Sequence, residues 1–233
     1  MRLINCLIVF LLSILSTNVN NDIYTRSYCL MDGNSLEVIG SKNQHEIRSV
    51  ASISKIMTAL ISIESDRLFE VVTVDEVIYQ IEGSSLYLEV GNEITIIDLV
   101  YGLLLRSGND AAVLLASNLS SSIDEFVKLM NNKAKEIGMN NTIFNNPSGL
   151  DIFDEGNLST PYDMSLLMSY CLNNRLFREI SSTKYYKTPL KGQWKNKNKL
   201  LFDYEYCIGG KTGVAPIFCE IYYEIKHYKV VFF

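Results

Sequence analysis

Ser52 and Lys55 are the residues whose types and spacing first suggest chemistry in this chain. Three positions apart on a helix they share a face, so the lysine amine can reach the serine hydroxyl. A serine hydroxyl is a poor nucleophile until a base removes its proton, and a lysine can do so where burial and nearby cations keep it neutral. The same spacing recurs at Ser181 and Lys184, so this motif alone is weak evidence for a nucleophile.

Two further polar elements follow in order, Ser107-Gly108-Asn109 and Lys211-Thr212-Gly213. Singly, each residue has an ordinary structural interpretation: Ser52 as a polar residue at a helix start, Asn109 as a helix N-cap, Lys211 as a solvated charge on a strand. The ordered set of three is far more specific than any one of them, because it matches the motif set of enzymes with an activated serine nucleophile.

The elements around these motifs are mostly buried helices. Apolar residues recur at helical spacing over 53–61, and a second helix, predicted over 95–105, has almost no polar face. A turn at 106–110 leads to a third helix over 111–118, which we expect Asn109 or Asp110 to cap. The Ser107-Gly108-Asn109 triplet would then lie on a tight loop between two buried helices, where side chains are held precisely.

Further helices are marked by their ends. Ser122 opens a capping box for a helix that Gly138 closes, and Thr160 with Pro161 supplies an N-cap and a first-turn proline for another. A short helix is predicted over 176–180, and no element is predicted in the polar segment 184–199.

Strand patterns occupy both ends of the chain. A hairpin is predicted from 25–31 and 36–40, and three strands from 206–213, 218–225 and 228–233. The simplest architecture is an α/β (α+β) fold in which both chain ends form one largely antiparallel sheet, with the helical middle packed against it.

The chain resembles the serine D-alanyl-D-alanine carboxypeptidases, the low-molecular-mass penicillin-binding proteins, from about Ser27 to about Gly213. The glycine of Ser107-Gly108-Asn109 is the carboxypeptidase form of the second motif. The stretches that carry the resemblance are Ala51-Ser52-Ile53-Ser54-Lys55-Ile56-Met57-Thr58-Ala59-Leu60, Leu105-Arg106-Ser107-Gly108-Asn109-Asp110-Ala111-Ala112, Asn146-Pro147-Ser148-Gly149-Leu150-Asp151, Ser159-Thr160-Pro161-Tyr162-Asp163-Met164 and Gly209-Gly210-Lys211-Thr212-Gly213.

The resemblance implies the β-lactamase/transpeptidase-like fold, no cofactor or metal, and a reaction through an acyl-serine. Ser52 would attack the carbonyl between two D-alanines of a peptidoglycan stem peptide, and neutral Lys55 would accept its proton. Ser107 would pass a proton to the leaving D-alanine, and Asn109 would position Lys55 and the substrate amide.

The same resemblance assigns substrate contacts. Lys211 and Thr212 would hold the terminal carboxylate, with Lys211 also lowering the pKa of Lys55. Gly213 would let the substrate backbone lie along the strand. The backbone N–H groups of Ser52 and Val214 would form the oxyanion hole, and penicillins would acylate Ser52.

Two other functions are compatible with the same motifs and are weighed against the carboxypeptidase. A class A β-lactamase needs a Glu-x-x-Leu-Asn loop, which is absent between Asn109 and Lys211. A catalytically impaired remnant that keeps the fold is the other, because only 20 residues follow Gly213. Members of the family continue with more strands, a closing helix and often a β-rich domain, so we expect residues 21–233 to be a catalytic domain truncated at its C-terminal end.

Composition limits the remaining classes. The 233 residues carry a net charge of −5 with scattered cations, which argues against nucleic acid as a partner. Residues 1–20 resemble a secretory signal, so we expect export to the cell envelope or periplasm, and an uncleaved segment would associate with a membrane. The spacing of Cys29, Cys171, Cys207 and Cys219 predicts no metal site and leaves disulfides and buried thiols equally open.

Overall fold

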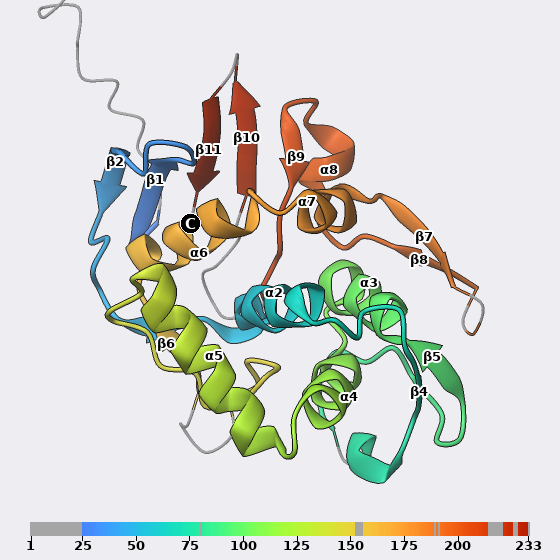
Figure 1. The fold of residues 1–233 in the computed structure, drawn as a ribbon. Helices are drawn as coiled ribbons and strands as arrows, with labels where there is room; N and C mark the ends of the chain where they lie inside the picture. Colours follow the sequence, from blue (N-terminus) through green and yellow to red (C-terminus); the bar gives the residue numbers. More distant parts are fainter. Residues whose placement is uncertain are drawn as a thin grey trace, which may run out of the picture.

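The computed structural model describes residues 25–79, 81–151, 156–188, 190, 192–213, 221–225 and 228–232. Strands lie at both ends of the described chain and helices occupy its middle, as the sequence predicts (Figure 1). The expected signal segment 1–20 lies outside the described residues.

Both chain ends contribute to one five-stranded sheet in the order β2-β1-β11-β10-β9. Every neighbouring pair is antiparallel. The last strand, β11, pairs with β1 on one side and β10 on the other, so both of its hydrogen-bonding edges are satisfied. The strands are β1 (Tyr28–Asp32), β2 (Val38–Lys42), β9 (Cys207–Gly209), β10 (Ile221–Ile225) and β11 (Tyr228–Phe232).

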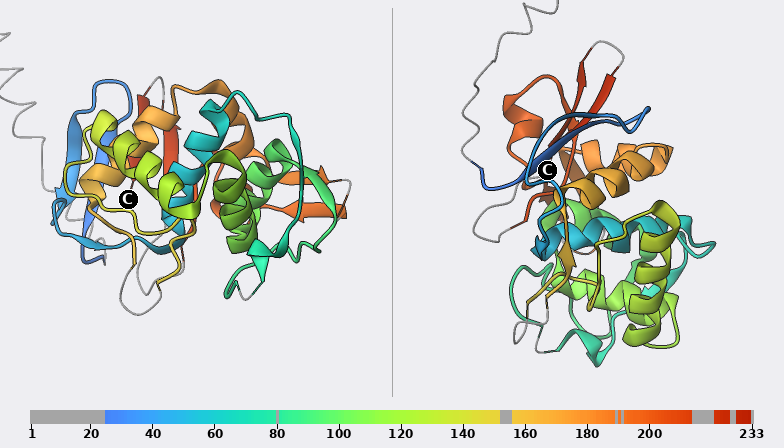
Figure 2. Two further views of the ribbon diagram at one scale, coloured as in Figure 1. Left: turned by 60° about the horizontal axis from the view of Figure 1, so that its bottom comes forward. Right: turned by 90° about the vertical axis from the view of Figure 1, so that its left-hand side faces the viewer.

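Helix α2 runs through the centre of the molecule, with α6 between it and the sheet, α3 beside it, and α4 and α5 on the side away from the sheet (Figures 1 and 2). Eight of its ten residues are buried, including Lys55. The helices are α2 (Lys55–Glu64), α3 (Ile96–Arg106), α4 (Asn109–Leu119), α5 (Ile123–Ile137), α6 (Pro161–Cys171), α7 (Arg175–Ser182) and α8 (Leu200–Asp203), with 3-10 turns η1 (Ala51–Ser54) and η2 (Glu76–Ile78).

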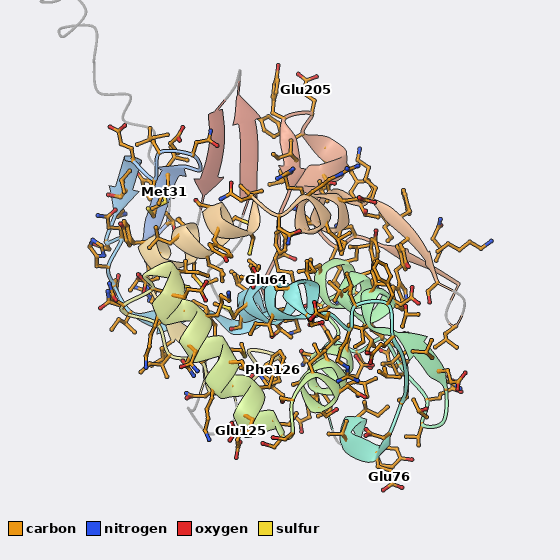
Figure 3. The ribbon with its side chains drawn as sticks, in the orientation of Figure 1. Met31, Glu64, Glu76, Glu125, Phe126 and Glu205 are labelled. Carbon is orange, nitrogen blue, oxygen red and sulfur yellow. The ribbon has the colours of Figure 1, made fainter. Side chains whose placement is uncertain are left out.

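The predicted helix ends explain why these segments stop where they do. The Ser122 hydroxyl accepts from the N–H of Glu125 at the start of α5, and Gly138 ends that helix in the left-handed conformation. The Thr160 hydroxyl caps α6, whose first turn begins with Pro161. Phe126 points from α5 into the core (Figure 3) and is fully buried.

The N-cap expected for α4 is wrong. Gly108 is the N-cap residue, no side chain caps the helix, and Asn109 is its first residue. The Asn109 side chain is directed instead toward Lys55 and the carbonyl of Glu82. The loop on which these motif residues lie is therefore as predicted, but its asparagine is not used for capping.

Three small strand pairs complete the fold, and none of them was predicted. Strands β7 (Tyr185–Thr188) and β8 (Gly192–Lys195) form a hairpin in the polar segment 184–199. Only Thr188 and Trp194 of it are buried, so it carries no regular apolar alternation. The other pairs are β3 (Arg48–Ser49) with β6 (Leu158–Ser159) and β4 (Val71–Thr73) with β5 (Glu93–Thr95).

The described cysteines are buried residues. Cys29, Cys171 and Cys207 are all buried, and Cys29 and Cys207 are free thiols. For these two the sequence left disulfides open, and the structure shows them as small core side chains. Cys219 lies outside the described residues.

Candidate active site

Ser52 lies in the 3-10 turn η1, directly before α2, and Lys55 is the first residue of α2. The Lys55 Nζ lies 3.0 Å from the Ser52 Oγ, within hydrogen-bond distance. Ser52 is partly exposed, whereas the lysine side chain is fully buried. The pair therefore places a hydroxyl at the surface of a cleft and an amine beneath it.

The Lys55 Nζ lies within hydrogen-bond distance of three oxygen atoms, so a neutral amine can donate to two of them and accept from the Ser52 hydroxyl. Besides the Ser52 Oγ, these are the Asn109 Oδ1 at 2.7 Å and the backbone carbonyl of Ser148. Among the described residues, none of its hydrogen-bond partners is a carboxylate. A buried ammonium group with only neutral acceptors is costly, so the surroundings favour the neutral amine.

The electrostatic surroundings act in the same direction. Burial lowers the pKa of the Lys55 amine well below its usual value, and the Lys211 and Lys197 ammonium groups lower it further. The Asp110 carboxylate raises this pKa, but by less than the other groups lower it. A lysine of lowered pKa within hydrogen-bond distance of a serine hydroxyl can act as a general base.

The second motif lies on the turn between α3 and α4. Ser107 is buried, and its backbone adopts the left-handed conformation with a φ of 65°. Its Oγ accepts a hydrogen bond from the Lys211 Nζ at 2.9 Å. Gly108 has no room for a side chain, because a Cβ there would lie 2.7 Å from Leu86. Asn109 bridges the site by donating from Nδ2 to the carbonyl of Glu82 at 2.6 Å while accepting from Lys55.

The third motif follows strand β9. Lys211 is buried, donates to Ser107 and to its neighbouring carbonyl at Thr212, and brings a positive charge to the centre of the site. Gly213 packs against the turn that carries Ser52, because a Cβ there would lie 3.0 Å from the Cγ1 and 3.6 Å from the backbone N of Ile53. Thr212 is half-buried beside it, and Val214 lies outside the described residues.

The site therefore brings together Ser52, Lys55, Ser107, Asn109 and Lys211, which come from three distant parts of the sequence. Two hydrogen-bonded chains form: Ser52 with Lys55 and Asn109, and Ser107 with Lys211. Ser181, the serine of the second Ser-x-x-Lys motif, lies on α7 and is buried. Its motif is not part of this arrangement.

The loop of residues 146–150, to which the sequence analysis assigned no function, also contacts the site. The carbonyl of Ser148 accepts from Lys55, and the carbonyl of Pro147 accepts from Thr58 at 2.7 Å. Asn146 and the fully buried Asn157 hold this loop through side-chain hydrogen bonds to its backbone. The sequence could not predict that these backbone carbonyls act as acceptors, because every residue type has a carbonyl. Only the Asn-Pro-Ser-Gly motif indicated that this loop belongs to the family resemblance.

A cleft of about 810 Å³ opens over Ser52 and Asn109. Its lining includes residues 83–85, Tyr87, residues 149–151, Arg106 and Lys197. Lys197 donates to the Ser84 Oγ at 3.1 Å. Sequence reasoning missed Lys197 and Arg106, because they lie outside the three motifs and lysine and arginine are ordinary surface residues.

Within the described parts of the chain, no group of three or more His, Cys, Asp or Glu side chains gathers where it could hold a metal ion. The same described residues contain no helix long and apolar enough to cross a membrane.

Comparison with known proteins places the chain in one family. The family described as D-alanyl-D-alanine carboxypeptidase matches residues 15–216. The D-alanyl-D-alanine carboxypeptidase DacF of Bacillus subtilis is 36% identical over 197 residues, which are 81% of this chain and 50% of that protein. DacC of Escherichia coli is 32% identical, over 82% of this chain and 50% of its own length. The chain thus spans about half the length of these curated relatives.

Solved structures show the same fold. The D-alanyl-D-alanine carboxypeptidase from Mycobacterium tuberculosis H37Rv superposes with a TM-score of 0.83 at 28% identity, covering 89% of this chain and 81% of the other. A point mutant of the Streptomyces K15 DD-transpeptidase gives 0.82 at 28% identity, over 89% and 88% of the two chains. The expected β-lactamase/transpeptidase-like architecture is therefore confirmed.

Proposed function

The chain belongs to the D-alanyl-D-alanine carboxypeptidase family, and from its site we propose that it removes the terminal D-alanine from peptidoglycan stem pentapeptides through an acyl-serine intermediate. The observation that carries this proposal is the contact of a buried lysine of lowered pKa with a partly exposed serine hydroxyl, at 3.0 Å. The relatives and the fold support the same reaction class.

In the first step Ser52 Oγ attacks the carbonyl carbon between the two D-alanines while Lys55 accepts the hydroxyl proton. The C–N bond then breaks, the acyl group remains on Ser52 as an ester, and the leaving amine takes a proton. Asn109 holds the Lys55 amine in line with Ser52, because its Oδ1 accepts from Lys55 and its Nδ2 is fixed on Glu82. Water finally hydrolyses the ester.

Ser107 and Lys211 serve the leaving group in this proposal. The Lys211 ammonium donates to the Ser107 hydroxyl oxygen, so the Ser107 proton can point toward the departing nitrogen. Lys211 and Thr212 bind the terminal carboxylate of the substrate. The close packing of Gly213 on Ile53 leaves the strand edge near Ser52, where the substrate backbone would add as a further strand.

The oxyanion hole is proposed to consist of the backbone N–H groups of Ser52 and Val214. We further propose that penicillins acylate Ser52 by the same route and that the protein acts outside the cytoplasm after export through residues 1–20. Association with a membrane through an uncleaved N-terminal segment is part of the same proposal. Residues 21–233 would form the catalytic domain.

Covalent labelling tests the nucleophile. The protein incubated with a fluorescent penicillin should carry one label, Ser52→Ala should carry none, and Ser181→Ala, the matched change in the second Ser-x-x-Lys motif, should be labelled as the unmodified protein is. A label that persists in Ser52→Ala would refute the assignment.

The alternatives give different results in the same samples. A β-lactamase would hydrolyse nitrocefin rapidly, whereas the absence of a Glu-x-x-Leu-Asn loop predicts a long-lived acyl-enzyme. An impaired remnant would unfold cooperatively yet take no label. Thermal unfolding measured beside labelling separates that remnant from an active enzyme.

A further inference from the structure

The residue before the nucleophile has an unusual backbone conformation. Ala51 has a φ of 43°, in the left-handed region that residues with a Cβ rarely adopt. Holding a non-glycine residue there costs on the order of 1 kcal/mol and requires support from the surrounding structure. The support around Ala51 shows what this conformation achieves.

Two neighbours fix the Ala51 carbonyl. The fully buried Ser54 donates from its Oγ to this oxygen at 2.7 Å. Gly149 packs directly against it, since a Cβ at Gly149 would lie 1.8 Å from the carbonyl oxygen and 2.3 Å from its carbon. The carbonyl is thereby directed into the protein, against the Asn146–Leu150 loop.

A trans peptide is planar, so its N–H points opposite to its C=O. With the Ala51 carbonyl directed into the protein, the N–H of Ser52 must point away from the loop, and Ser52 itself lines the cleft. We infer that Ser54 and Gly149 are positioning residues that hold the Ala51–Ser52 peptide in the orientation in which the Ser52 N–H donates to the developing oxyanion. The inference rests on the proposed function.

The same loop also holds the base. Its Ser148 carbonyl accepts from Lys55, so one short segment fixes both the base and the peptide of the nucleophile. That segment is itself rigid: the Asn146 Oδ1 accepts from the N–H of Gly149 at 2.6 Å, and the Asn157 Nδ2 donates to the carbonyl of Asn146 at 2.9 Å. A displacement of the loop would misplace two catalytic groups at once.

Ser54→Ala tests the hydrogen bond, with Ser62→Ala as its matched control. Ser62 is equally buried on the adjoining helix α2 and also donates to a backbone carbonyl, that of Thr58 at 2.8 Å, but it lies outside the site. Stopped-flow labelling with a fluorescent penicillin resolves the non-covalent dissociation constant from the acylation rate constant. Ser54→Ala should lower the rate constant about tenfold and leave the dissociation constant within about twofold, because a displaced oxyanion donor acts on the transition state.

The pH profile distinguishes positioning of the oxyanion donor from a change in the base. Acylation by Ser54→Ala should be slower at every pH, with the acid limb of the profile unmoved. Ser62→Ala should match the unmodified protein in both constants. Equal rate constants for Ser54→Ala and the unmodified protein would overturn the inference, as would equal losses in Ser54→Ala and Ser62→Ala.

Gly149→Ala tests the packing independently, with Gly138→Ala as its control. Both glycines have positive φ values, 72° and 91°, so both substitutions carry the conformational cost. Only at Gly149 does the new Cβ collide with the Ala51 carbonyl, whereas at Gly138 nothing lies within 4 Å. We expect Gly149→Ala to lose about 100-fold in the acylation rate constant and Gly138→Ala to lose none.

The outcomes separate the two proposals. An unmodified protein that penicillin does not acylate would overturn the proposed function itself. If the unmodified protein is acylated and Gly149→Ala, shown to be folded by circular dichroism, is acylated as fast, only the positioning of the Ala51–Ser52 peptide is refuted.

Discussion

Replacing Asn109 by aspartate exchanges its Nδ2 amide, which donates to the Glu82 carbonyl, for an oxygen and so places a negative charge beside the buried amine. The Asn109 Oδ1 lies 2.7 Å from the Lys55 Nζ, so the new carboxylate would face Lys55 at ion-pair distance. An opposite charge this close raises the pKa of a lysine by about 1–3 units. The change opposes burial and the Lys211 and Lys197 charges, which lower this pKa in the unmodified site.

The magnitude follows from the fraction of neutral amine. Below the pKa this fraction falls tenfold for each unit by which the pKa rises, and each unit corresponds to about 1.4 kcal/mol. Asn109→Asp should therefore acylate about 10- to 1000-fold more slowly at neutral pH and recover as the pH rises. The acid limb of the rate profile should move to higher pH by the same amount, about 1–3 units.

The assay is the acylation rate constant with a fluorescent penicillin, measured across pH for three variants. Asn109→Ala removes both hydrogen bonds without adding charge, so its acid limb should not move upward. Asn118→Asp places the same charge near the other end of α4, about 13 Å along the helix axis, and should behave as the unmodified protein does. A uniform loss of rate in Asn109→Asp with an unmoved acid limb would refute the account of Lys55 as the base.

Three further substitutions probe separate parts of the structure. Lys197→Met removes a cation that lowers the pKa of Lys55. The acid limb should therefore move to higher pH, by less than in Asn109→Asp because Lys197 is exposed to solvent; an unmoved limb would contradict this. Asp110→Asn removes the charge that raises the pKa of Lys55, so the acid limb of the acylation profile should move to lower pH. It also weakens the hydrogen bonds to Ser85 and to the N–H groups of Leu86 and Leu88, so urea unfolding should show a loss of about 1–3 kcal/mol in stability. Stability equal to that of the unmodified protein would show that the segment 85–88 does not depend on this carboxylate. Phe126→Ala empties a fully buried position on α5 and should cost about 3–5 kcal/mol in urea unfolding while labelling at low temperature persists; a cost below about 1 kcal/mol would mean that the core does not depend on this ring.

The sequence predicted the elements with regular patterns and explicit ends. Helix α3 reads as a continuous apolar helix. Helix α5 begins and ends, and α6 begins, at residues whose side chains or φ values define caps. The sheet built from both chain ends followed from strand patterns alone. The mostly exposed β7–β8 hairpin could not be predicted, because pairing between polar strands leaves no apolar alternation.

The candidate site was predictable where side chains form it. Ser52, Lys55, Asn109 and Lys211 are marked by type and by order along the chain. The Ser148 carbonyl is not, since every residue has a carbonyl and only the fold decides which one reaches Lys55. For Asn109 the local sequence suggested a structural role that the fold does not use. Its position at a helix start suggested an N-cap, but its side chain contacts Lys55 and Glu82 instead.

The central claim is that this chain hydrolyses the bond between two D-alanines. Mass spectrometry of a peptidoglycan stem pentapeptide incubated with the protein tests it most directly. We predict the appearance of the tetrapeptide together with free D-alanine, both abolished in Ser52→Ala and both retained in Ser181→Ala. An intact pentapeptide after incubation with a folded protein that penicillin does label would contradict the claim.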